Sequence, residues 1–225
     1  MTDFSRRSLL ALLCLAGAPF VACNEAVKDQ TKDFDAEAGE KGASVKKNVK
    51  PEPDAEVAVI ETELGRLVVE LYPNLAPQHV ERFKKLAAEG FYNGTTLHRI
   101  DPNLGIIQGG DPNSKDSNPF NDGTGKSPYP DLPAEFSDVS FERGIVAAAR
   151  SGSFDSANSQ FFIMLKPQPA FEQPGNRYTI FGRVTEGINN AAIISTAPVR
   201  EGTTDRPADP VAIKSVTLQP RSNFK

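Results

Sequence analysis

The sequence predicts a mainly β protein, an antiparallel barrel capped by helices. Short runs rich in Val, Ile, Phe and Thr recur after residue 56 and are separated by Gly, Pro, Asn and Asp, a pattern typical of short strands joined by turns. Only two segments repeat apolar residues at helical spacing. Many short strands with two helices favour a sheet closed on itself, with the helices covering its ends.

Composition and charge narrow the possible functions. The 225 residues are 39% apolar and 24% charged, which excludes collagen-like, fully disordered and polytopic membrane proteins. Twenty-five basic residues against twenty-nine acidic ones give a net charge of -4, so we expect no nucleic-acid partner. Two His and two Cys leave few soft ligands, and we expect neither a metal nor a cofactor.

Residues 1–23 have the composition of a signal peptide. Arg6 and Arg7 precede an apolar run from Leu9 to Val21, which is shorter than the ~20 residues of a membrane-spanning helix. We therefore expect an exported protein in the periplasm or another part of the envelope. The export route stays open between the twin-arginine pathway, with Leu9 where that motif favours Phe, and the general secretory pathway.

The end of this segment, Phe20-Val21-Ala22-Cys23, resembles a bacterial lipobox, in which the cysteine is lipidated and becomes the first residue. The alternative is cleavage by the ordinary signal peptidase after Ala16-Gly17-Ala18, but Pro19 would follow that cut and disfavours it. Cys14 lies in the apolar run and would be removed with it, so Cys23 would be the last cysteine. No disulfide can then form. We expect membrane contact only through a lipid anchor at Cys23.

Residues 24–55 mix charges of both signs with Gly, Ser and Pro, and their apolar residues are isolated. Such a stretch cannot bury enough surface to offset chain entropy, so we expect a flexible tether. A helical stalk is the alternative, but Gly39, Gly42, Pro51 and Pro53 weaken it.

The predicted domain covers residues 56–220, with a tail at 221–225. Its first elements are a hairpin, residues 57–64 and 66–72 around Gly65. A helix follows, with Pro77 in its first turn and Gly90 as its stop. His79 falls among the polar residues of this helix, so we expect it to face solvent. Further strands are expected at residues 144–149, 160–165, 178–184 and 211–218, with a second helix at 187–196.

Three other chemistries find weak support. Gly123-Thr124-Gly125-Lys126-Ser127 lacks the first glycine of a phosphate-binding loop, because Phe120 stands there. Asp111-Pro112-Asn113-Ser114-Lys115-Asp116 has Lys and Asp where a calcium loop needs a ligand and a glycine. Neither histidine has a serine in an elbow sequence, so hydrolysis by a Ser-His-Asp triad is not indicated.

An ordered set of motifs runs along nearly all of residues 57–218. Its most specific segments are Leu97-His98-Arg99-Ile100-Asp101-Pro102, Gln108-Gly109-Gly110-Asp111, Gly123-Thr124-Gly125, Ala148-Ala149-Arg150, Ser159-Gln160-Phe161-Phe162-Ile163 and Tyr178-Thr179-Ile180-Phe181-Gly182-Arg183-Val184. One His-Arg or Gln-Gly-Gly alone would have little specificity. The whole set, in this order, resembles the cyclophilin-type peptidyl-prolyl cis-trans isomerases.

The resemblance implies a closed eight-stranded antiparallel barrel with two helical caps. It implies a monomer that binds proline-containing polypeptide segments and accelerates rotation about X–Pro bonds without a cofactor. Arg99 would donate a hydrogen bond to the prolyl nitrogen, and Gln108 would bind the substrate backbone. The other substrate-binding residues that it implies are Leu104, Ile106, Gly123, Ala149, Arg150, Ser151, Gln160, Phe162, Phe171 and Tyr178.

The segment after Arg99 departs from the family pattern. Eight residues separate Arg99 from Gln108, where the family usually has seven with a central Phe-Met pair. Either Leu104 or Gly105 then takes the place of the pocket Phe, and the sequence leaves this choice open. Losing an aromatic wall weakens proline-ring packing by about 1–2 kcal/mol.

A second hypothesis is a non-catalytic module on the same fold that binds proline peptides or assists assembly. The Leu104-Gly105 pair favours the module. The enzyme is favoured by the retention of Arg99, Gln108, Gln160 and Phe162. A carbohydrate- or metal-binding barrel lacks the aromatic platforms and ligands that it would need.

Overall fold

The computed structural model describes residues 44–224. The signal peptide predicted for residues 1–23, its lipidated Cys23, and residues 24–43 of the predicted tether lie outside the described residues. Within residues 44–224, no helix combines the length and the apolar character needed to cross a bilayer.

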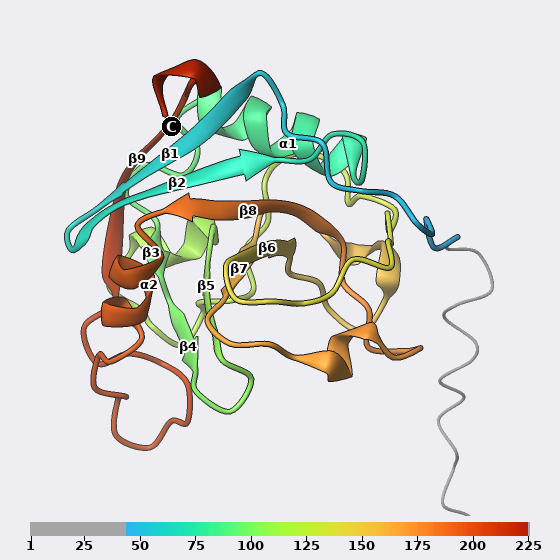
Figure 1. Cartoon of the computed structure of the whole chain (residues 1–225). Coiled ribbons are helices and arrows are strands. Elements are labelled where there is room, and N and C mark those ends of the chain that lie inside the picture. Colours follow the sequence, from blue (N-terminus) through green and yellow to red (C-terminus); the bar gives the residue numbers. More distant parts are fainter. Residues whose placement is uncertain (1–43, 225) are drawn as a thin grey trace, which may run out of the picture. The chain divides into compact units, whose positions relative to one another are not determined.

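The described residues form nine antiparallel strands in a nearly closed barrel (Figure 1). The strands are β1 (Glu56–Thr62), β2 (Gly65–Leu71), β3 (Thr96–Leu97), β4 (Arg99–Asp101), β5 (Ile106–Gly109), β6 (Ile145–Ala148), β7 (Phe161–Met164), β8 (Ile180–Glu186) and β9 (Val211–Pro220). Their order in the sheet is β3-β9-β1-β2-β8-β6-β7-β5-β4. The predicted mainly β barrel is confirmed.

The barrel nearly closes at its two edge strands, β3 and β4, which are neighbours in the chain. Only His98 lies between them. β3 pairs with β9 and β4 pairs with β5, so residues 96–101 change partners at His98 and join the two edges. The structure has nine strands where eight were expected, and this division accounts for the additional one.

The hairpin of β1 and β2 depends on Gly65 and Thr62. Gly65 has φ +109°, a conformation that glycine adopts without strain, and a Cβ there would lie 2.6 Å from Nδ2 of Asn190. The Thr62 hydroxyl donates to the carbonyl of Gly65 at 2.6 Å. These contacts set the register that pairs Val59 with Val68, as the predicted hairpin requires.

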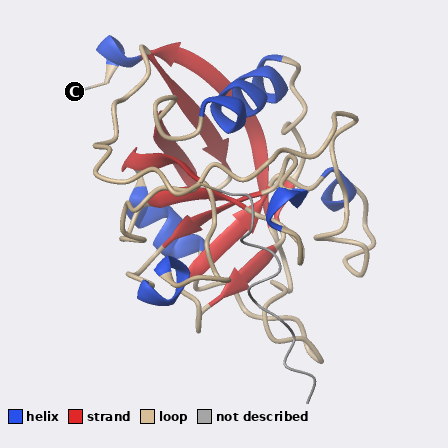
Figure 2. Ribbon diagram, turned by 90° about the vertical axis from the view of Figure 1, so that its right-hand side faces the viewer, coloured by secondary structure: helices blue, strands red, loops and turns tan. Residues whose placement is uncertain are grey.

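Two α-helices, α1 (Pro77–Ala88) and α2 (Ile188–Ile194), pack against the strands of the barrel (Figure 2). Both were predicted, but the prediction that His79 faces solvent was wrong, because only 4% of His79 is exposed. The Glu135 carboxylate covers the start of α1. It accepts hydrogen bonds from the backbone N–H groups of Gln78 and His79 and lies 2.7 Å from His79 Nδ1. Helix α1 has no side-chain cap of its own, so Glu135 satisfies N–H groups that would otherwise be free.

Burial on both faces of β7 separates two hydrophobic clusters. Phe161 and Ile163 belong to the larger cluster, which also contains Phe83 of α1. The alternate residues, Phe162 and Met164, belong to a second cluster on the opposite face, because successive side chains of a strand point to opposite sides. The candidate site lies on this second face.

Residues 44–55 lie against the domain, so the flexible tether predicted through residue 55 was wrong for this part. Lys46 donates from its backbone N–H to Phe136 O at 2.9 Å, and its Nζ donates to Leu75 O at 2.8 Å. The backbone N–H of Asp54 donates to Leu71 O at 2.8 Å. Hydrogen bonds to backbone groups hold residues 44–55 against the domain. The sequence of this segment has no apolar periodicity that would predict such contacts.

Four short 3₁₀ helices complete the described structure: Pro112–Lys115, Phe154–Ser156, Pro169–Glu172 and Arg221–Asn223. The last belongs to the predicted tail. Phe224, which follows it, packs on a third small cluster with Val57, Val59 and Val68.

Candidate active site

Sheet register places three of the predicted site residues in one row. Arg99 on β4 pairs with Gln108 on β5, and Gln108 pairs with Phe162 on β7. Phe162 in turn pairs with Ala147 on β6. Residues directly opposite each other share a face of the sheet, so a guanidinium, an amide and an aromatic ring stand side by side.

The Arg99 guanidinium is held from three directions. Its Nε donates to Asp205 Oδ2 at 2.7 Å, and its Nη2 donates to Asp101 Oδ2 at 2.9 Å. Its Nη1 donates to Gln108 Oε1 at 3.2 Å. The Arg99 side chain is 33% exposed. A cation that is fixed in orientation and open to solvent can act as a hydrogen-bond donor to a bound molecule.

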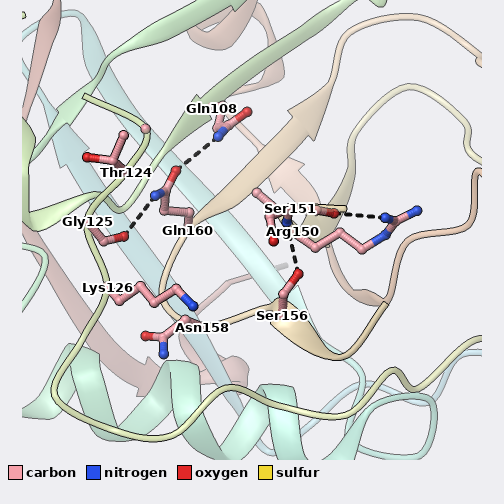
Figure 3. Close-up of a pocket in the computed structure, with 11 residues that line it drawn as sticks. Gln108, Thr124, Gly125, Lys126, Arg150, Ser151, Ser156, Asn158 and Gln160 are labelled. Atoms are coloured by element: carbon pink, nitrogen blue, oxygen red, sulfur yellow. Dashed lines mark hydrogen bonds between the residues drawn. The ribbon is translucent and has the colours of Figure 1, made fainter. Parts of the chain in front are cut away.

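A chain of amides continues from Arg99 into the next part of the site. Gln108 Nε2 donates to Gln160 Oε1 at 3.0 Å, and Gln160 Nε2 donates to Gly125 O at 2.9 Å (Figure 3). Each amide oxygen accepts from the preceding residue and each NH2 donates to the next. This direction fixes how both glutamine side chains are turned.

The Phe162 ring of this row belongs to an aromatic group with Phe171 and Tyr178. Phe162 and Tyr178 have ring centroids 5.1 Å apart and nearly perpendicular, and Phe171 lies 4.9 Å from Tyr178 and 5.9 Å from Phe162. Ile106 belongs to the same buried cluster, and Leu104 packs against it. The arrangement places a buried apolar cluster, with the partly buried Leu104 and Tyr178 packed against it, on the same face of the sheet as a cationic donor.

The structure decides between Leu104 and Gly105. The turn after β4 closes with a hydrogen bond from Gly105 N to Asp101 O at 2.7 Å, and Gly105 has φ +70°. A Cβ on Gly105 would lie 2.3 Å from the side chain of Lys166, so this position forms the turn. Leu104 supplies the side chain to the apolar cluster, although it is aliphatic rather than aromatic.

A pocket of about 310 Å³ opens beside Gln108, Gln160 and Gly125 (Figure 3). Its lining contains Gln108, five of the ten other predicted substrate-binding residues, and several residues that the sequence did not indicate. The full lining is Gln108, Gly123, Thr124, Gly125, Lys126, Ala149, Arg150, Ser151, Ser156, Asn158 and Gln160. Phe171 and Tyr178 lie with the aromatic group and do not line this pocket.

Arg150 connects the pocket to the aromatic group. Its guanidinium lies 4.6 Å from the centroid of Phe154 and 4.7 Å from that of Tyr178, within the range of cation–π attraction. Its Nε donates to Arg177 O at 3.0 Å and its Nη1 donates to Ser151 O at 3.0 Å. Burial lowers the pKa of Arg150. These contacts hold Arg150 as part of the wall.

Asp111 organises the loop that forms the near side of the pocket. It is fully buried, and its carboxylate accepts hydrogen bonds from the backbone N–H groups of Asn113, Gly123 and Gly125. Gly123 has φ +86°, and a Cβ on Gly125 would lie 2.1 Å from Asp111 Oδ1. Glycine at both positions therefore lets the loop wrap around the carboxylate.

His98 is a buried neighbour of this loop. It is 4% exposed, and burial lowers its pKa more than the nearby Asp111 raises it. The ring is therefore uncharged at neutral pH. Its position at the division between β3 and β4 favours a structural role.

Besides several residues that line the pocket, sequence reasoning missed the two carboxylates that hold Arg99, those of Asp101 and Asp205. Asp101 had a signal, because residues two apart on a strand share a face. Asp205 had none, since it comes from the segment between α2 and β9. Within residues 44–224, no group of three or more His, Cys, Asp or Glu side chains is arranged to hold a metal ion.

Known proteins are similar to this chain in sequence and in fold. The family model of the cyclophilin type peptidyl-prolyl cis-trans isomerases matches residues 57–218. A probable peptidyl-prolyl cis-trans isomerase of Brucella suis is 46% identical over 129 residues, which cover 56% of this chain and 64% of that protein. The match thus spans less than two thirds of the length of this Brucella relative.

Two further relatives match over almost their whole length. The Schizosaccharomyces pombe peptidyl-prolyl cis-trans isomerase ppi1 is 34% identical over 166 residues, 71% of this chain and 97% of that protein. The crystal structure of a Cryptosporidium parvum cyclophilin in the presence of the dipeptide Ala-Pro superposes with a TM-score of 0.62 at 27% identity, covering 72% of this chain and 98% of that one. The chain belongs to the family of cyclophilin-type peptidyl-prolyl cis-trans isomerases.

Proposed function

We propose that the domain accelerates cis-trans rotation about X–Pro bonds in exported or envelope proteins and so assists their folding. The observation that supports this most directly is the row of Arg99, Gln108 and Phe162, in which a fixed cationic donor and an aromatic ring lie on either side of one amide. Family membership supports the same reaction.

The chemistry needs no nucleophile and no titrating base. Rotation about an amide bond meets a barrier of about 18–20 kcal/mol, because the planar bond is stabilised by resonance. In the twisted transition state the conjugation is lost, and the prolyl nitrogen gains a lone pair that can accept a hydrogen bond. A donor aimed at this nitrogen stabilises the transition state more than either planar state, which is the requirement for catalysis.

In this proposal Arg99 is the donor and Gln108 binds the substrate backbone. The proline ring packs against Phe162, with Ile106 and Leu104 beside it. Residues before the proline lie along the pocket formed by Ala149, Arg150, Ser151 and Gln160, and Gly123 lets the substrate backbone pass closely. Phe171 and Tyr178 support the Phe162 ring through their edge contacts.

The proposed setting is the bacterial envelope, with the domain anchored as a monomer through a lipid on Cys23. Charged, Gly-containing residues between Cys23 and residue 44 would allow the domain to reach polypeptides emerging near the membrane. The test is metabolic labelling with a fatty acid. We expect label in the wild type and none in Cys23→Ser, and a wild type without label would contradict the anchor.

The test of the enzyme is a proline-isomerisation assay on the full chain, with Arg99→Ala beside it. Loss of one preorganised donor costs about 10²–10³ in rate, so we expect at least a hundredfold fall in kcat/KM. Arg143→Ala is the matched control, because Arg143 is exposed and bonds to Asn189. The variant must keep the wild-type circular dichroism spectrum for the comparison to hold.

The alternative, a non-catalytic module that binds proline peptides, is favoured by the aliphatic Leu104 in the pocket wall. Titration with a proline peptide separates the two functions. If the wild type binds the peptide but does not accelerate its exchange, the chain is a recognition module. Acceleration that collapses in Arg99→Ala excludes the module.

A further inference from the structure

We propose that Asp205 is a positioning residue that orients the Arg99 guanidinium for reaction. This inference rests on the proposed function and adds a residue to it. Asp205 lies 106 positions after Arg99 in the sequence, and its Oδ2 accepts from Arg99 Nε at 2.7 Å.

The geometry of the guanidinium shows what this contact does. Arginine has five N–H bonds in one plane, and three of them point to Asp205, Asp101 and Gln108. The remaining two, one on each terminal nitrogen, have no acceptor within residues 44–224 and are the donors left for a substrate. Fixing Nε prevents the plane from turning and so determines where these two donors point.

The two carboxylates that bind Arg99, those of Asp101 and Asp205, differ in their other hydrogen-bond partners. Asp101 Oδ1 also accepts from Leu104 N at 2.9 Å, so Asp101 shapes the turn after β4 as well. The Asp205 carboxylate has Arg99 as its one side-chain partner in the described chain. Of the two, Asp205 therefore acts on the orientation of Arg99 alone.

Backbone contacts hold the Asp205 segment in place without its side chain. The backbone oxygen of Asp205 accepts from Ile100 N at 2.7 Å, and Arg200 N donates to Arg206 O at 2.7 Å. Removing the carboxylate should therefore leave the segment beside β4. This independence makes the residue testable by substitution.

The expected sizes of the two effects indicate that the Asp205 carboxylate matters more for the orientation of Arg99 than for the stability of the fold. The Arg99 and Asp205 side chains are 33% and 30% exposed, and ion pairs this open to water add at most about 1 kcal/mol to stability. Misplacing a reacting group by about 1 Å can cost on the order of 10²-fold in rate. Because Asp101 and Gln108 still hold Arg99 when Asp205 is removed, we expect an intermediate loss, about tenfold.

The experiment compares the full-length wild type with Asp205→Ala, Asp205→Asn and Asp209→Ala in the isomerisation assay. Asp209 is exposed on the same segment, so it controls for the loss of one negative charge. Asp205→Ala should lower kcat about tenfold with little change in KM. Asp205→Asn keeps an oxygen that accepts from Nε, and should recover the rate to within roughly threefold of the wild type because a neutral acceptor is about half as strong.

A second readout reports on Arg99 directly. In the wild type, NMR should show a slowly exchanging Nε–H for Arg99, and this signal should be lost in Asp205→Ala and kept in Asp209→Ala. A role limited to stability would change the unfolding midpoint and leave kcat unaltered.

The outcomes separate this inference from the function on which it rests. A wild type without activity overturns the proposed enzyme, and this inference with it. An active wild type that Arg99→Ala disables, and whose Asp205→Ala variant keeps the full kcat, overturns the positioning role alone. A fall in kcat that Asp209→Ala reproduces also overturns it, because the effect would then be one of net charge.

Discussion

Arg99, Gln108 and Phe162 stand on three neighbouring strands, whereas the pocket beside them is lined mostly by loops between residues 123 and 160. Backbone pairing fixes the order of the first group, and each residue has a defined neighbour. In the loops, a buried carboxylate, that of Asp111, holds the 123–125 segment by accepting hydrogen bonds from its backbone N–H groups. The row of Arg99, Gln108 and Phe162 depends on strand register, whereas the loops of the pocket depend on particular side chains. Substitutions in these two regions should therefore have different effects on stability and binding.

The largest effect should come from removing the carboxylate that shapes the loop. Asp111→Ala leaves the N–H groups of Asn113, Gly123 and Gly125 without their acceptor. A fully buried group left unsatisfied costs about 1–3 kcal/mol. Gly123 is exposed and Asn113 and Gly125 are half-buried, so water recovers part of this cost. We expect the free energy of unfolding to fall by about 3 kcal/mol in total. Denaturant unfolding measures it.

Hydrogen exchange should locate that loss. The amides of residues 123–126 should exchange faster in Asp111→Ala, while those of β4, β5 and β7 keep their relative protection. Asp111→Asn retains one acceptor oxygen and should lie between the two proteins. A loss below about 1 kcal/mol would show that the loop is held in some other way.

A smaller effect is expected on the strand side from Leu104→Phe. A larger apolar ring beside Phe162 should tighten binding of a proline peptide by about 1 kcal/mol, roughly fivefold in Kd. Fluorescence titration measures this affinity, with Leu104→Ala expected to weaken binding. Unchanged affinity in both variants would remove Leu104 from the binding surface.

The smallest effect should be a response to acid, confined to the loop side. Burial acts to raise the pKa of Glu135, but hydrogen bonds from His79 and from the backbone of Gln78 outweigh it, and the pKa lies below its ordinary 4.5. The hydrogen bond from Lys126 lowers the pKa of Asp131 in the same way.

The direction of this response follows from the two lowered pKa values. An unfolded chain takes up these protons first as the pH falls, so the stabilisation is complete above about pH 4.5 and is lost as the pH passes through the lowered values. Hydrogen exchange between pH 6 and pH 4 should show faster opening of residues 126–136 and little change in β5 and β7. Glu135→Gln should reduce the difference, and equal responses on both sides would contradict the comparison.

Much of the fold was predictable because its elements carry local signals. Gly65 between two β-rich runs predicted the hairpin, and Pro77 with the apolar spacing after it predicted α1. The packing of residues 44–55 against the domain was not predictable, because it depends on hydrogen bonds from Lys46 and Asp54 to backbone oxygens far along the chain. His79 was misplaced for a similar reason: Glu135, 56 residues later, covers it.

The sequence alone determined the kind of protein, because the ordered motifs along residues 57–218 indicated the family. Arg99, Gln108 and Phe162 were predicted through this resemblance, because a motif is a property of neighbouring residues. Only the tertiary structure decided that Leu104 rather than Gly105 enters the apolar cluster, that Asp111 shapes the 123–125 loop, and that Asp205 holds Arg99. Each of these depends on segments brought together by barrel closure and loop packing, and such contacts have no fixed spacing along the chain.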